Sequence, residues 1–224
     1  MLRAARLIAA KDILLTAKRG SALVQVILLG FLLVVLFSLS LGSTAKADPV
    51  AAAAVFWLAS AFCLTILSTA LFSLEETHKA RLGLLLAPIP AQAVWLGKSM
   101  AALCLLLLVQ AALLLASAIF LGRHWTGHIP IALAGLVLVD LGVVGLASLL
   151  ASLARGQAVR ESLCSLVVFP LLLPQFLAGV RMLAAAYGAE GPPPTDWLGF
   201  AAAFDAIFTA AALVLFPVIY GGDA

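Results

Sequence analysis

Two carboxylates stand inside long apolar stretches of the sequence, Asp140 near the middle of one stretch and Asp205 nearer the end of another. A charge at membrane depth is costly, so each should face protein or water. Such a residue can serve a proton relay or a polar substrate path, or it can hold helices together through a hydrogen bond. We favour the structural role for Asp205 and leave both roles open for Asp140. We expect Gln110 to join helices.

Two histidines, His124 and His128, stand four residues apart in a polar stretch. On a helix this spacing could ligate a metal ion. Gly122 and Gly127 disfavour a helix there, so we expect an exposed loop and predict no metal site. The cysteines form no CxxC pair, and we expect neither a disulfide nor a zinc site.

The tripeptide Gly97-Lys98-Ser99 matches the end of a phosphate-binding loop. That loop needs a glycine five residues before Gly97, and the position holds Gln92. No strand is predicted before it, and an apolar stretch follows. We therefore predict no nucleotide site and no catalytic residue in this chain.

The composition indicates what must position these residues. Of 224 residues, 65% are hydrophobic and 10% are charged. Soluble domains are about 25% charged. This composition excludes a soluble enzyme, a DNA-binding domain and a disordered chain, and it indicates an integral membrane protein. The net charge of +3 comes from scattered basic residues, so no nucleic-acid partner is expected.

Six stretches are long enough to cross a bilayer, which takes roughly 20 apolar residues in a helix. We expect an all-α integral membrane fold, with residues 1–224 forming one membrane domain. The predicted spans are 21–41, 51–74, 99–121, 130–153, 163–183 and 198–220.

Orientation follows from the excess of Lys and Arg in cytoplasmic segments. With the N-terminus in the cytoplasm, that side holds 10 of the 13 basic residues, and both termini are cytoplasmic. Residues 1–20 are expected to form a helix at the cytoplasmic interface. On a helical wheel Leu2, Ala9 and Ile13 share a face, whereas Ile8 does not. A frayed basic extension of the first span is the alternative.

The connection over residues 75–98 holds the densest charge cluster of the chain, followed by an apolar run that ends at two prolines. Such a segment can dock into a groove of a soluble partner, as amphipathic helices do. An ordinary loop that returns to the membrane is the alternative. The candidate docking residues are Glu75, Glu76, Arg81, Leu84, Leu85 and Pro88.

The fifth stretch contains Pro170 and Pro174. Each proline removes a backbone donor and clashes with the preceding turn. We therefore predict a kinked helix at this point, and a kink can widen a cavity between helices.

Four groups of residues, taken in order and spacing, resemble one family. The basic start, the six spans and the charged loop look like an ABC-2-type permease, and the chain resembles the haem exporter protein B (CcmB) family of cytochrome c maturation. The matching segments are 10–15 running on to 37–38, 83–88 with 96–98, 160–163 leading to 169–174, and 197–198 with 203–205, 208 and 215–216. The sequence departs from the family pattern at Thr16, near Pro217 and over residues 78–81, within the docking segment.

The resemblance implies a multi-pass protein of the bacterial inner membrane, used as a homodimer, that couples ATP hydrolysis by a CcmA-like ATPase to release of a haem-loaded periplasmic chaperone. It implies CcmC-like, CcmD-like and CcmE-like partners besides the lipid bilayer. ATP would be bound by the partner, no cofactor is expected in this chain itself, and direct contact with haem is left open. An ABC-2 exporter of another lipid-like or amphipathic solute is the alternative, followed by a stand-alone proton-coupled carrier that uses Asp140.

Overall fold

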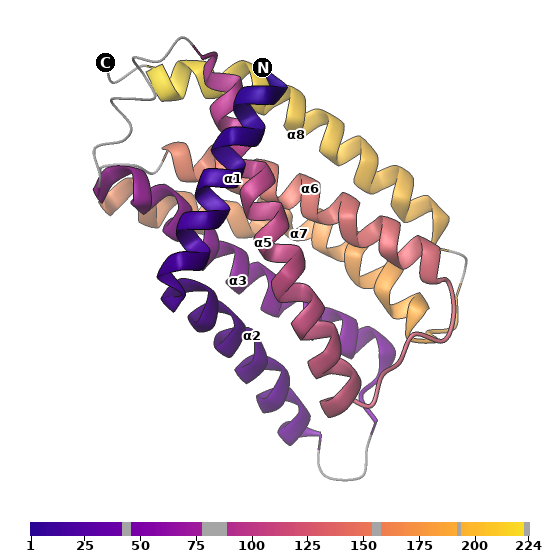
Figure 1. The fold of residues 1–224 in the computed structure, drawn as a ribbon. Helices are drawn as coiled ribbons and strands as arrows, with labels where there is room; N and C mark the ends of the chain where they lie inside the picture. Colours follow the sequence, from indigo (N-terminus) through magenta and orange to yellow (C-terminus); the bar gives the residue numbers. More distant parts are fainter. Residues whose placement is uncertain (42–45, 78–88, 154–157, 192–193, 222–224) are drawn as a thin grey trace.

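A computed structural model describes residues 1–41, 46–77, 89–153, 158–191 and 194–221, with side chains described except at 19, 21, 72–77, 153, 158–169 and 218–221. This part of the chain is helical and contains no strand, which confirms the predicted all-α fold (Figure 1). The helices are α1 (Leu2–Arg19), α2 (Ser21–Ser40), α3 (Pro49–Thr77), α5 (Ala91–Phe120), α6 (Ile129–Leu153), α7 (Ala158–Ala186) and α8 (Thr195–Gly221).

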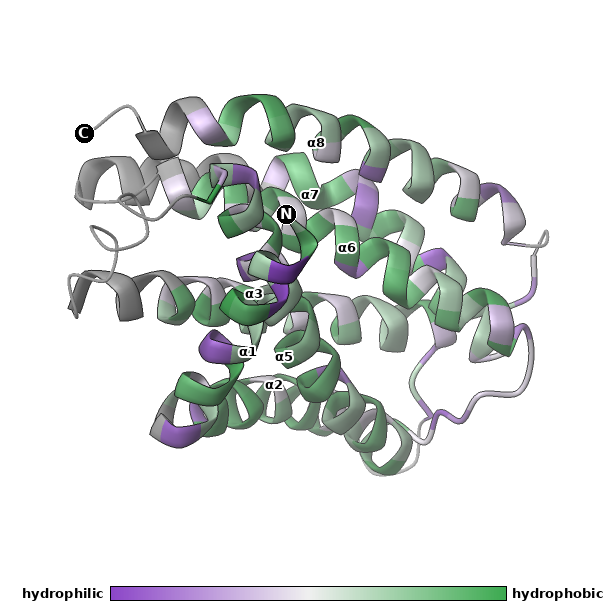
Figure 2. Cartoon of the chain, turned by 45° about the horizontal axis from the view of Figure 1, so that its top comes forward, coloured by the Kyte–Doolittle hydropathy of each residue, from purple (hydrophilic) through white to green (hydrophobic). Residues whose placement is uncertain are grey.

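Five helices are long and apolar enough to cross a membrane. Their apolar parts are Ala22–Ser40, Pro49–Leu71, Ala91–Phe120, Ile129–Ser152 and Thr195–Pro217. The described apolar part of α7 is shorter, Pro170–Ala186, so a sixth span stays a prediction. Figure 2 shows apolar residues along these helices, with hydrophilic residues gathered on α1 and in the connections.

The last turns of α3 and α6 and the first turns of α5 and α7 lie at one end of the bundle, together with Met1 and the end of α8 (Figure 1). We call this end the N-terminal end. The other ends of the long helices meet at the opposite side. The arrangement is that of antiparallel neighbours joined by short connections.

Two helices extend further into the predicted 75–98 loop than expected. α3 continues to Thr77, and α5 begins at Ala91 rather than at Ser99. Pro90 precedes α5 in an extended conformation, with φ −67° and ψ 141°, and its carbonyl accepts the first helical hydrogen bond from Ala93. The prediction that residues 91–98 belong to a loop is therefore wrong. Pro90 marks the start of α5, and the polar residues that follow it do not interrupt the helix.

The N-terminal segment is helical, as predicted, and α1 packs against α5. Of the residues that share a face on the wheel, Ala9 is buried but Leu2 is 69% exposed, and Ile8, which lies off that face, is buried. The buried face follows a helical spacing and consists of Ala5, Ile8, Ala9, Asp12 and Thr16. Two of these residues are polar, so the apolar pattern was too weak to reveal the face.

The core of the bundle needs close helix contacts at specific glycines. Trp57 of α3 is 2% exposed, with its ring centroid 6.0 Å from that of Phe176 on α7. A Cβ atom at Gly179 would lie 2.5 Å from Cε2 of Trp57. The indole therefore fits against α7 only because residue 179 is a glycine. Small residues allow such close packing between helices in membrane bundles.

Candidate functional site

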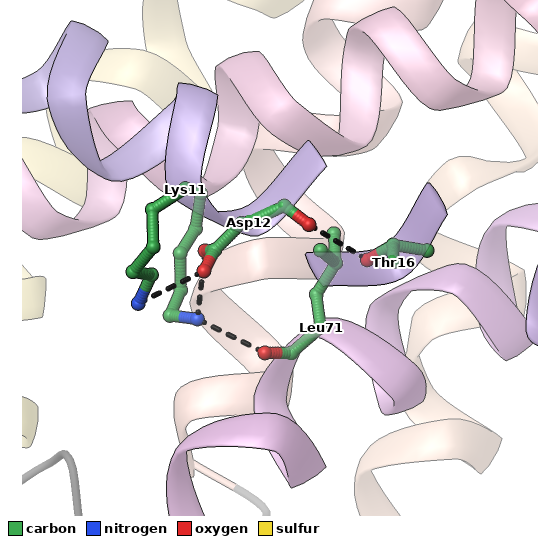
Figure 3. A network of polar contacts seen from close by, with 5 residues as sticks. Lys11, Asp12, Thr16 and Leu71 are labelled. Carbon is green, nitrogen blue, oxygen red and sulfur yellow. Dashed lines mark hydrogen bonds and ion pairs between the residues drawn. The ribbon is translucent and has the colours of Figure 1, made fainter. Parts of the chain in front are cut away.

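A buried ion pair joins three helices near the N-terminal end. Nζ of Lys98 on α5 lies 3.3 Å from Oδ2 of Asp12 on α1, with the two side chains 0% and 1% exposed. The same ammonium group donates to the carbonyl oxygen of Leu71 on α3, at 3.0 Å (Figure 3). We call Asp12, Lys98 and the Leu71 carbonyl the buried clamp.

A second lysine approaches the same carboxylate from the surface. Nζ of Lys11 lies 3.0 Å from Oδ1 of Asp12, and its side chain is 41% exposed (Figure 3). Thr16 Oγ1 donates to the main-chain carbonyl of Asp12 at 2.8 Å. Asp12 therefore has one buried and one solvent-accessible cationic partner, and the two should differ strongly in energetic importance.

The chain packs closely beside the buried clamp. A Cβ atom at Gly97 would lie 2.8 Å from the Ala5 carbonyl oxygen and 2.9 Å from Cβ of Ile8. Gly97 thus lets α1 approach α5, and the neighbouring Lys98 reaches Asp12. The tripeptide that resembled part of a phosphate loop lies inside α5, and its first two residues hold α1.

Sequence reasoning missed this clamp. The prediction placed Lys98 at the end of the cytoplasmic connection, although a lysine followed by a long apolar run is a candidate for a buried partner. The sequence also contained a clue to the partner of Lys98, because Asp12 is the one acidic residue among the cations of residues 1–20.

Deeper in the bundle, Gln110 of α5 and Asp140 of α6 are both 1% exposed. Nε2 of Gln110 donates to Oδ1 of Asp140 at 2.9 Å. This contact gives Asp140 the partner that a polar group at membrane depth requires, and it joins two helices. The geometry favours the structural role that the sequence left open, and it gives Gln110 the role expected of it.

A second amide–acid pair joins α7 and α8. Nε2 of Gln175 donates to Oδ1 of Asp205 at 2.8 Å, and Gln175 is fully buried. A Cβ atom at Gly142 of α6 would overlap Oδ1 of Asp205 and lie 2.8 Å from Nε2 of Gln175. Gly142 therefore makes room for the pair. Gln175 was not singled out from the sequence, although it is the polar residue that directly follows Pro174 in an apolar helix.

The two amide–acid pairs leave the same atoms without a partner among the described residues. These atoms are the amide oxygens of Gln110 and Gln175 and Oδ2 of Asp140 and Asp205. A protonated carboxyl group can exchange two hydrogen bonds with a primary amide, donating to its oxygen and accepting from its nitrogen. Each pair can therefore form two hydrogen bonds between helices without a charged group.

The predicted docking residues fall largely outside the described part of the chain. Glu75 and Glu76 belong to the last turn of α3, but their side chains are not described. The other docking residues, Arg81, Leu84, Leu85 and Pro88, lie outside the described residues.

The remaining candidate residues are placed but not brought together. His124 and His128 are exposed in the connection between α5 and α6, and His128 has a positive φ of 49°. Among the described residues, no group of three or more His, Cys, Asp or Glu side chains could hold a metal ion. Pro170 and Pro174 lie inside α7, where the kink stays a prediction.

Comparison with known proteins gives one family. A family model described as "CcmB protein" matches residues 3–219 of the chain. No curated protein matches the sequence. The matched range begins at the second residue of α1 and includes both kinds of buried polar contact described above.

Proposed function

Because the chain belongs to the CcmB family, whose members act in haem transport and cytochrome c biogenesis, we propose that it is the permease subunit that couples a partner's ATP hydrolysis to release of a haem-loaded periplasmic chaperone. The match over residues 3–219 carries this proposal. The nucleotide is bound by a CcmA-like partner, and this chain supplies the movement across the membrane.

Movement enters through the connection between α3 and α5. α3 ends and α5 begins at the N-terminal end of the bundle (Figure 1), and both helices are long enough to cross the membrane. A partner that pushes on Glu75, Glu76 and the residues that follow therefore acts on two spans at once. A switch of this kind needs contacts that differ between two states of the partner.

The proposed topology has six spans, with α7 as the sixth and both termini in the cytoplasm of a bacterium whose inner membrane holds the protein. Cationic residues on α1 support this orientation, since Lys and Arg accumulate on the cytoplasmic side. The assembly contains two copies of this chain, together with CcmC-like, CcmD-like and CcmE-like partners.

The test is haem staining of membrane proteins after denaturing electrophoresis, in a strain that lacks the gene. We expect loss of the c-type bands, retention of b-type haem proteins and rescue by the intact gene. Normal c-type bands in the deletion strain would overturn the function and favour an ABC-2 exporter of another amphipathic solute.

Docking is tested separately by a double charge reversal, Glu75→Lys with Glu76→Lys. We expect the protein to insert in the membrane and the c-type bands to disappear. The matched control is Glu190→Lys, an exposed acidic residue at the opposite end of the bundle, which should leave the bands unchanged. Normal bands in the double reversal would remove the docking assignment.

The carrier alternative draws less support from the geometry. Asp140 is 1% exposed and is engaged by Gln110. A carboxylate that exchanges protons with water during transport needs access to water in at least one state. The contact between α5 and α6 instead favours a residue that holds two spans together.

A further inference from the structure

The buried clamp joins α3 and α5 on either side of residues 78–90, which directly follow the last turn of α3 with Glu75 and Glu76 and which we call the docking connection. Leu71 lies shortly before the end of α3, and Lys98 lies shortly after the start of α5. The hydrogen bond from Nζ of Lys98 to the Leu71 carbonyl therefore joins the two helices that flank the connection. A displacement of the connection cannot separate these helix ends without breaking this contact.

Asp12 adds a third helix to the same point. Its carboxylate binds Lys98, so α1 is held to the helices that flank the docking connection. Next to it, Ile8 packs with Trp95, Leu149 and Phe216 in one buried cluster, which extends the contact to α6 and α8. Gly97 keeps the backbones of α1 and α5 close together.

We propose that the buried clamp transmits displacement of the docking connection to α1, so that α1, the end of α3 and the start of α5 move as one body. Asp12 and Lys98 are positioning residues for the coupling reaction, and this inference rests on the proposed function. α1 is then a moving part of the permease rather than a helix that only rests at the membrane surface.

A buried ion pair is better suited to transmitting a displacement between helices than to stabilising the fold. An ion pair buried from water is often no more stabilising than apolar residues of the same volume, yet separating its charges is strongly unfavourable. Such a pair fixes which groups meet and resists any relative movement that would part them.

The first experiment separates transmission from stability with three variants in the assembled complex. Lys98→Met leaves Asp12 buried without its inner partner, and we expect a clear fall in thermal stability. Asp12→Asn combined with Lys98→Met removes both charges, and we expect stability to return while release of the haem chaperone stays about tenfold lower, an ordinary size for coupling between sites. The matched control Lys11→Met removes the outer cation and should leave release unchanged.

Two results of this experiment would overturn the inference. One is release at the wild-type rate in the restabilised double variant, which would reduce the clamp to a structural contact. The other is an equal loss of release in Lys11→Met, which would show that the net charge of α1 matters and the buried geometry does not. Either result leaves the docking assignment standing, because that assignment depends on Glu75 and Glu76.

The second experiment measures the movement directly. Spin labels at Leu2→Cys on α1 and at the native Cys104 on α5, six residues after Lys98, occupy exposed positions, in a background with Cys63 and Cys164 replaced by alanine. We expect one narrow distance distribution that is the same with and without ATP, and a broad one in the Asp12→Asn, Lys98→Met double variant. An equally narrow distribution in that double variant would overturn the clamp whether or not the docking assignment holds.

Discussion

The two buried polar regions of this membrane protein both give polar side chains partners away from water, but the chemistry of the partners differs. Near the N-terminal end, a full ion pair and a main-chain carbonyl join three helices through Lys98. In the middle of the bundle, amides take the place of cations, and each acidic side chain has an amide partner from a neighbouring helix. Because a separated charge is costlier the deeper it lies, the charged contact occurs near the end and the amide contacts occur at depth.

From this difference we expect the two regions to have different functions. The clamp joins α1 to the helices that flank the docking connection, so its failure would affect coupling. The amide–acid pairs join α5 to α6 and α7 to α8, so their failure would affect how the spans stay together. Variants that separate these outcomes decide whether the distinction is real.

The largest effect is expected from Asp12→Ala, which removes the buried ion pair between Asp12 and Lys98. Removing one partner of a buried ion pair costs about 3–5 kcal/mol. We expect the free energy of unfolding in mixed detergent micelles to fall by this amount. Gln110→Ala should lower it by only about 1–3 kcal/mol, because it removes the hydrogen-bond partner of a polar group rather than the counter-ion of a charge. Equal losses in the two variants would erase the distinction between the regions.

The second effect concerns the glycines that let each region form. Gly97→Ala places a methyl group against the Ala5 carbonyl and Ile8, and Gly142→Ala places one against Asp205 and Gln175. Overpacking of this kind costs about 1–3 kcal/mol. We expect the first to reduce chaperone release and the second to lower thermal stability with less effect on release per folded complex.

The control for both glycines is Gly199→Ala, because a Cβ atom there meets nothing within 4 Å. This variant should be neutral or slightly stabilising, since alanine favours a helix more than glycine does. A loss of stability in Gly199→Ala as large as in Gly142→Ala would mean that helix glycines matter here for a reason other than space.

The sequence predicted the helices well because their signal is strong. Long apolar stretches specify spans with little dependence on partners, and the five that the structure bears out agree with the predicted ranges apart from their ends. The start of α5 was placed too late, because the predicted cytoplasmic connection extended to Lys98. The N-terminal helix was predicted, yet its apolar pattern did not reveal the buried face, because Asp12 and Thr16 on that face hide its periodicity.

The polar contacts were harder to predict than the helices that carry them. Asp140, Asp205 and Gln110 stood out as polar residues in apolar stretches, but nothing in the sequence pairs Gln110 with Asp140 or Gln175 with Asp205. Such pairs depend on how the helices cross, and Gly142 fixes one crossing by providing space rather than by a contact. A local pattern does not carry that information.

A third effect tests whether the amide–acid pairs need a charge. Asp140→Asn keeps an oxygen that can accept from Nε2 of Gln110, so we expect stability and c-type cytochrome levels close to wild type. Asp140→Leu removes the acceptor and leaves Gln110 buried without a partner, at a cost of about 1–3 kcal/mol. Loss of function in a stably folded Asp140→Asn protein would contradict a structural role and revive the proton-coupled carrier.

The smallest effect is expected from Lys11→Met, and it sharpens the comparison within a single carboxylate. Lys11 and Lys98 both approach Asp12, at 3.0 and 3.3 Å, but their side chains are 41% and 0% exposed. Water and salt screen the outer pair, whose contribution should lie at about 0–1 kcal/mol and decrease as ionic strength rises. The inner pair should be nearly insensitive to salt. Unfolding measured at low and high salt checks both statements, and a salt-sensitive loss in Lys98→Met as small as that in Lys11→Met would mean that water reaches the clamp, which could then not hold α1 to the docking connection.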